Sequence, residues 1–256
     1  MSLTAATLSP SAYWYLTRGT GTVALVLLTI SVGLGIMGSV RLSSPRWPRF
    51  AIDSVHRDVS LLAVALLVIH VITTVLDGFA PITLLDGLIP FASAYRPLWL
   101  GLGTLSFDLI LALVITSLVR RRLGYRAWRA VHWLAYVSWP VAVLHTLGTG
   151  TDVKQWWLLL ITVACILAVL LAVVVRVGAV DRARGGLRAG AYALSVITPI
   201  GIVAFALEGP LQHGWARRAG TPARLLGRAT TAASAREVTS TAPGQAPTNA
   251  ALRRPF

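Results

Sequence analysis

Six long apolar runs most constrain what this chain can fold into, and charged residues, glycine or proline separate each run from the next. A bilayer core ~30 Å thick is crossed by about 20 apolar helical residues, and lipid offers no partner for a free backbone N–H or C=O. The runs cover residues 13–37, 53–76, 98–119, 129–148, 156–178 and 190–207. The last is the weakest because Pro199 and Gly201 interrupt it. We therefore predict an all-α integral membrane protein, a bundle of about six transmembrane helices, five plus a weaker sixth.

The composition agrees with a lipid bilayer as the main surroundings of the chain. Hydrophobic residues make up 55% and charged residues only 12%, about half the charged share of a soluble domain. The 23 basic residues outnumber the 9 acidic ones, but they lie between the apolar runs, which indicates membrane topology and no nucleic-acid partner. The single cysteine, Cys165, excludes a disulfide framework or thiolate metal cluster within this chain.

The basic residues also predict an orientation and a domain organisation. Thirteen lie in or beside the first, third and fifth connections, and three lie at the N-terminus and in the second and fourth connections. Cytoplasmic loops are rich in Arg and Lys, so we expect a multi-pass protein of the cytoplasmic membrane with its N-terminus outside. A short tail, 1–12, without the basic start of a signal peptide, would precede a transmembrane helical domain, 13–207. An Arg/Ala/Pro-rich tail, 208–256, is expected to be disordered, and its side depends on whether the sixth segment spans or re-enters.

Four histidines inside the predicted spans form the candidate site. His56 and His70 lie on the second span, 14 residues apart, and His132 and His145 lie on the fourth, 13 apart. These spacings correspond to about 21 and 19.5 Å along a helix. The two spans run in the same direction, so His56 is level with His132 and His70 with His145. Each pair is placed to hold one iron porphyrin from both axial sides, which predicts two b-type hemes stacked across the bilayer.

The rotational positions of the histidines agree less well with this pairing. At about 100° per residue, His56 and His70 fall ~40° apart on one face, but His132 and His145 fall ~140° apart. A kink or change of twist in the fourth span is therefore needed, and Pro140 lies between the two histidines. Each histidine on its own has a simpler interpretation as a hydrogen-bonding group between helices.

These features resemble the ferric reductase-like transmembrane domain over roughly residues 13 to 178. The resemblance rests on the 14 and 13 spacings, on Tyr15 to Gly21 (YLTRGTG) and on Arg126 to His132 (RAWRAVH). That family includes ferric reductases, NADPH oxidases and the heme-bearing membrane subunit of bacterial methionine sulfoxide reductase. The resemblance implies that His56 and His132 ligate an inner heme iron, that His70 and His145 ligate an outer one, and that electrons cross the membrane between them.

The chain departs from the larger members of that family after its fifth span. No G-x-G-x-x-G dinucleotide motif occurs in the residues that follow. We therefore expect a separate electron donor, a flavin reductase or a quinol, and an acceptor outside such as ferric iron, oxygen or a partner protein.

Three arginines are candidates for binding heme propionates. Arg57 and Arg129 lie beside the inner histidines, and Arg18 lies near the outer end of the first span. A guanidinium can bind a carboxylate through two parallel hydrogen bonds, although a purely topological role is also open. Asp108, the one acid well inside a span, is open to a structural pairing, a proton relay or a role beside a histidine. The apolar connection from Asp77 to Pro97 is expected to fold over the outer site.

Two other functions remain open at this point. A cytochrome b-like quinol-oxidising subunit also carries paired histidines on two helices. A non-redox transporter or assembly anchor would use the histidines to bind a metal ion or to hydrogen-bond between helices. A metal ion takes its ligands at about 2 Å, so a depth separation of ~20 Å along the helices keeps all four histidines from sharing one ion.

Overall fold

The structure is a computed structural model, and it describes residues 12–40, 48–150, 152–178 and 185–226. Its elements are all helical in these ranges. They are α1 (Ala12–Ser39), α2 (Arg49–Leu76), α3 (Pro97–Leu118), α4 (Arg120–Leu123), α5 (Tyr125–His132), α6 (Ala135–Thr149), α7 (Trp156–Gly178), α8 (Gly185–Glu208) and α9 (Trp215–Arg218). Residues 1–11, most of the N-terminal tail predicted above, lie outside the described part.

Four of these helices are long and apolar enough to cross a membrane: α1, α2 (from Phe50), α3 and α7. The chain is therefore a multi-pass membrane protein. The helix α6 has 15 residues, about 22 Å, and the apolar helical stretch Val196–Glu208 at the end of α8 is also shorter. The predicted number of six spanning helices is thus not confirmed.

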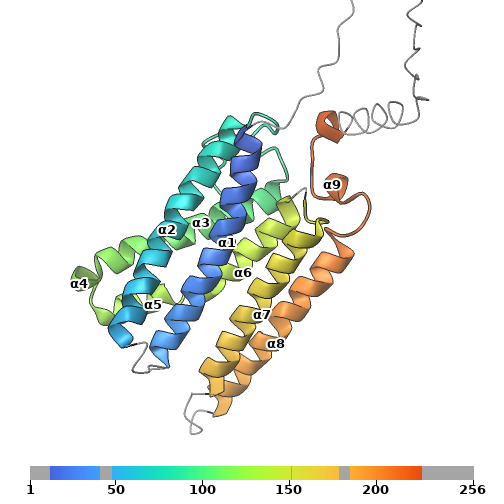
Figure 1. The fold of residues 1–256 in the computed structure, drawn as a ribbon. Coiled ribbons are helices and arrows are strands. Elements are labelled where there is room, and N and C mark those ends of the chain that lie inside the picture. Colours follow the sequence, from blue (N-terminus) through green and yellow to red (C-terminus); the bar gives the residue numbers. More distant parts are fainter. Residues whose placement is uncertain (1–11, 41–47, 151, 179–184, 227–256) are drawn as a thin grey trace, which may run out of the picture.

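The helices pack as neighbouring antiparallel pairs (Figure 1). The first pair is α1 with α2, the second is α3 with α6, and α7 lies between α1 and α8. A buried cluster joins α1, α6, α7 and α8 through Leu25, Val143, Cys165 and Ile202. Many large apolar side chains on α2, α7 and α8 are instead exposed, as expected for surfaces that contact lipid tails.

The bundle has two ends that differ in composition. We call the end at which α1 begins and α2 ends the His70 end, and the opposite end the His56 end. The short helices α4 and α5, with exposed Arg120, Arg121, Arg122 and Arg126, lie at the His56 end (Figure 1). The helix α9 lies at the His70 end (Figure 1).

The predicted fourth span, 129–148, is two helices. α5 stops at His132 and α6 starts at Ala135. Around this break the backbone forms bonds three residues back: Leu134 N to Val131 O (2.9 Å), Tyr136 N to Trp133 O (3.1 Å) and Val137 N to Leu134 O (3.0 Å). Each residue in such a tightened turn rotates the helix by about 120° instead of 100°. Three or four residues of this kind therefore reduce the ~140° offset between the two histidines to roughly 60–80°. The required change of twist is therefore present, and it precedes Pro140, which lies inside α6.

Residues 209–226, the first part of the predicted C-terminal tail, pack against the bundle in the structure. Ala219 and Leu225 are buried, and the Trp215 indole donates to Gly148 O on α6 (3.1 Å). Composition suggested disorder because this stretch has few large apolar residues. Its order comes instead from a few aromatic and hydrogen-bonding anchors. Residues 227–256 lie outside the described residues.

Candidate functional site

The four histidines gather into two pairs, one near each end of the bundle. His70 on α2 and His145 on α6 line a single cavity of about 270 Å³. The His56 and His132 rings approach each other at the other end, with centroids 6.4 Å apart and planes 76° apart. His56 of α2 thus lies beside His132 of α5, and His70 of α2 shares a cavity with His145 of α6, at the depths that the sequence predicts.

The spacing of His56 and His132 fits one metal atom between them. Two axial metal–nitrogen bonds of ~2.0 Å, with ~1.1 Å from each nitrogen to its ring centre, require centroids about 6.2 Å apart. The observed centroid distance of 6.4 Å is close to this value. Among the described residues, no hydrogen bond joins these two rings directly.

Three of the four imidazoles share one hydrogen-bonding pattern. In each, Nδ1 lies beside a backbone carbonyl of the neighbouring helix, and a carbonyl can only accept, so Nδ1 carries the hydrogen and Nε2 keeps its lone pair. The pairs are His70 with Thr17 O (2.8 Å), His56 with Ser31 O (3.0 Å) and His145 with Trp99 O (2.8 Å). This arrangement fixes the ring orientation and increases the basicity of the free nitrogen, as is usual for metal-ligating histidines.

A glycine lies one helical turn after each of these carbonyls and gives the imidazole its space. A Cβ at Gly21 would lie 2.9 Å from the His70 ring, and one at Gly35 would lie 3.4 Å from His56. A Cβ at Gly103 would overlap the His145 ring. We refer to these combinations of carbonyl and glycine, 17/21, 31/35 and 99/103, as the imidazole seats.

Reasoning from the sequence missed these seats, although the sequence contains a signal for them. Gly21 and Gly35 are 14 residues apart on α1, the same spacing as His56 and His70 on α2. Two antiparallel helices in contact place such matched spacings opposite each other. A pair of glycines and a pair of histidines with the same spacing, on consecutive apolar runs, therefore indicates two seats.

His132 is the exception among the four histidines. Its Nδ1 is buried and, among the described residues, has no hydrogen-bond partner. The ring of Trp128 packs against it, with centroids 5.0 Å apart, and the Trp128 indole donates to Ser117 Oγ on α3 (3.2 Å). His132 is therefore oriented by an aromatic ring in place of a carbonyl, which leaves it the least constrained of the four.

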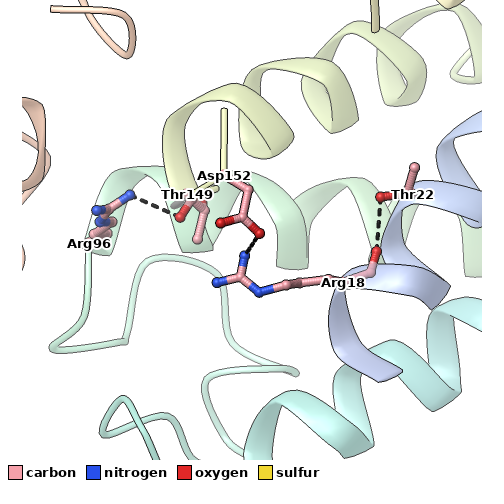
Figure 2. A network of polar contacts seen from close by, with 5 residues as sticks. All are labelled: Arg18, Thr22, Arg96, Thr149 and Asp152. Atoms are coloured by element: carbon pink, nitrogen blue, oxygen red, sulfur yellow. Dashed lines mark hydrogen bonds and ion pairs between the residues drawn. The ribbon is translucent and has the colours of Figure 1, made fainter. Parts of the chain in front are cut away.

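The three arginines assigned to heme propionates have different surroundings. Arg18 forms an ion pair with Asp152, which follows α6, and both line the cavity of His70 and His145 (Figure 2). Arg57 pairs with the adjacent Asp58, and its side chain is 69% exposed. Arg129 is exposed, with its guanidinium 6.0 Å from the Tyr125 ring centre. Of the three, Arg18 is the one that lies in a cavity with histidines, and the sequence did not anticipate its partner Asp152.

The connection between α2 and α3 folds over the cavity, as expected from its apolar composition. Phe79, Ile82 and Tyr95 line the same cavity as His70 and His145. The Thr104 hydroxyl on α3 donates to Asp86 O (2.7 Å) and holds the connection down. Asp108, by contrast, has no hydrogen bond or ion pair among the described residues, so the structural pairing considered for it is not observed.

Comparison with known protein families gives a match over the histidine-bearing part of the chain. The model of the family described as "Ferric reductase like transmembrane component" matches residues 20–143. No curated protein matches the chain, and no solved structure does. The matched stretch begins just before Gly21, ends two residues before His145, and contains the other three histidines. Residues 20–143 of this chain therefore match the ferric reductase-like transmembrane component family, the family that the sequence resembles.

Proposed function

We propose that this chain is a transmembrane electron-transfer protein that holds two b-type hemes, one between His56 and His132 and one between His70 and His145. The observation that carries the proposal is the repeated imidazole seat, in which a backbone carbonyl fixes Nδ1 and leaves Nε2 free at three of the four histidines. A histidine that only joined two helices would have no need of the same orientation of its second nitrogen at each position. Bound hemes would supply one-electron redox chemistry.

The residues of the chain have distinct parts in this proposal. The four histidines are the axial ligands. Gly21, Gly35 and Gly103 keep the space that the rings occupy, and α1 and α3 supply the carbonyls that orient them. Arg18, Arg57 and Arg129 would bind propionates, with Arg18 exchanging all or part of its pairing with Asp152 for this purpose. The buried bundle between the two sites excludes water and lowers the local dielectric.

The direction of electron transfer follows from the topology that the arginines predict. With α4 and α5 on the cytoplasmic side, His56 and His132 hold the inner heme and receive electrons from a separate flavin reductase or a quinol. His70 and His145 hold the outer heme and pass electrons to an acceptor outside. The basic surface of α4 and α5 beside His132 supports this side as the one facing the cytoplasm.

The alternative in which the histidines bind a metal ion directly has less support. Among the described residues, no three His, Cys, Asp or Glu side chains gather in the way that a metal ion needs. The quinol-oxidising alternative uses the same hemes, and it differs in the donor. A quinol-site inhibitor that changes heme reduction would favour it.

Absorption spectra of the purified protein, oxidised and dithionite-reduced, test the proposal. We expect a Soret band and two hemes per chain. His56→Ala and His132→Ala should each remove the same heme, and His70→Ala and His145→Ala should each remove the other heme. A double variant of one pair should lose no more heme than either single variant. His213→Ala, an exposed histidine outside both pairs, is the matched control and should keep both hemes. A protein expressed with adequate heme that shows no Soret band would contradict the proposal.

A further inference from the structure

The segment after α8 makes close contacts with the residues that orient His145. The Trp99 carbonyl accepts from His145 Nδ1 (2.8 Å). The ring of the same Trp99 stacks on Phe205 of α8, with centroids 4.6 Å and planes 23° apart, and lies 5.3 Å from the Trp215 ring of α9. The residue that holds the histidine is thus itself held between α8 and α9.

The same segment also fixes the end of α6, one turn after His145. The last carbonyls of a helix lack amide partners within it. Here Gly148 O accepts from both the Trp215 indole (3.1 Å) and Arg96 Nη1 (3.1 Å), and Thr149 O accepts from Arg96 Nη1 (2.9 Å) (Figure 2). Gly148 lies under the Trp99 ring, where a Cβ would overlap it. The helix end and the Trp99 ring are therefore packed as one unit.

Arg96 links this unit to the C-terminal segment. Its Nε donates to Thr221 Oγ1 (2.9 Å) and its backbone N–H to Gly220 O (3.1 Å). The residue is 3% exposed and has φ +45°, a left-handed conformation that is unfavourable for a residue other than glycine. Such a conformation persists only where the surroundings determine it strongly, and four hydrogen bonds from one residue do so here.

We propose that Arg96 and Trp215 are positioning residues of the His70/His145 heme, acting through Trp99 and the end of α6. The segment Trp215–Leu226 is then a strap that completes the outer heme site, although it lies far outside the part of the chain that matches the family. This inference rests on the proposed function, since it concerns a heme held by His145.

The proposal predicts an effect on one heme only. Trp215→Phe keeps a ring against Trp99 but loses the indole donor to Gly148 O. We expect the variant to bind the His70/His145 heme about tenfold more weakly, the lower end of the 10–100-fold range for residues that support metal ligands. The absorption and midpoint potential of that heme should shift, while the His56/His132 heme stays unchanged. Arg96→Gln removes all three guanidinium bonds and should reduce the heme content from two to one per chain.

The experiment measures heme content, reduced-minus-oxidised spectra and a potentiometric titration for each full-length variant. The remaining heme is assigned by adding His56→Ala, which should then abolish it. Trp156→Phe is the matched control, because Trp156 is at the same end of the bundle but 74% exposed, and it should behave as the wild type. If Arg96→Gln does not fold, Trp215→Phe still tests the proposal.

Two results would overturn the positioning role. One is a Trp215→Phe protein with both hemes at wild-type affinity and potential, and the other is an equal loss of both hemes together with a lower melting temperature. A wild-type protein without heme would contradict the proposed function itself, and this result is distinguishable from the two that would overturn the positioning role.

Discussion

At the scale of single residues, the candidate site depends on small side chains next to large ones. Each imidazole seat combines a ring, a carbonyl and a glycine, and only the ring was recognised from the sequence as a functional residue. The glycines carry no chemistry, but a methyl group at two of them would occupy the space of a ligand. Steric tests therefore separate the seats more clearly than removal of the ligands does.

Gly21→Ala and Gly35→Ala form a matched pair for such a test. Both are glycines inside α1, so alanine should improve the helix propensity of both equally, by about 1 kcal/mol. At Gly21 the new Cβ would lie 2.9 Å from the His70 ring, whereas at Gly35 it would lie 3.4 Å from His56, an ordinary contact. Overpacking costs about 1–3 kcal/mol, so we expect Gly21→Ala to weaken heme binding at the His70 end by about 5- to 150-fold.

Titration of the two alanine variants with heme measures this difference. Gly35→Ala should keep wild-type heme affinity at both sites. If Gly35→Ala instead lost as much heme affinity as Gly21→Ala, helix α1 as a whole, and not the contact with His70, would set heme affinity. A more thermally stable Gly35→Ala protein with two hemes would agree with the expected gain in helix propensity.

At the scale of elements, the sequence was most informative where hydrophobic runs and histidine spacing agreed. The runs at 13–37, 53–76, 98–119 and 156–178 correspond to α1, α2, α3 and α7, with boundaries differing by a few residues. The prediction of one helix over 129–148 was wrong because hydropathy does not register a turn between His132 and Ala135. The need for a change of twist was visible in the 13-residue spacing, but its position depends on backbone hydrogen bonds that the composition does not encode.

The position of that change leads to a prediction about Pro140. Since the tightened turns lie around residues 131–137, Pro140→Ala should restore a helical hydrogen bond without altering the phase between His132 and His145. We expect two hemes per chain in this variant. Insertion of one alanine between Leu134 and Ala135 should instead rotate α6 by about 100° relative to α5 and remove at least one heme.

Heme content and difference spectra of the two variants measure the outcome. If Pro140→Ala lost a heme and the insertion did not, the proline and not the break would set the phase of the two ligands. The insertion of one alanine after Gly150, outside the helices that carry ligands, controls for the effect of a longer chain.

At the scale of the whole molecule, the His70 end is closed by contacts between segments far apart in the sequence. Arg18 on α1 reaches Asp152, and Arg96 reaches Thr221. Such contacts have no local signal, so the sequence could not predict them. It could predict that charged residues inside or beside a membrane would find partners, and the ion pair of Arg18 is an example.

With a heme held by His70 and His145, as proposed, the Arg18–Asp152 pair should make the potential of that heme sensitive to charge. Asp152→Asn removes one negative charge from the cavity of His70 and His145, in which the Arg18 charge remains. A more positive surrounding disfavours the ferric state, so the midpoint potential of that heme should rise. A tenfold change in the ratio of reduced to oxidised heme corresponds to 59 mV for one electron, and we expect a shift of about this size.

Asp58→Asn is the matched control at the other end of the bundle. Asp58 also pairs with an arginine, Arg57, but the side chains are 63% and 69% exposed, where water and salt screen the charge. Potentiometric titrations at low and high salt should therefore show a small, salt-sensitive shift for Asp58→Asn and a larger, less salt-sensitive one for Asp152→Asn. If both variants shifted the potential equally, the Arg18–Asp152 pair would lie too far from the outer heme to act on it, and the role of Arg18 toward its propionates would fall as well. If Asp152→Asn lowered the potential, the electrostatic argument for this pair would be wrong.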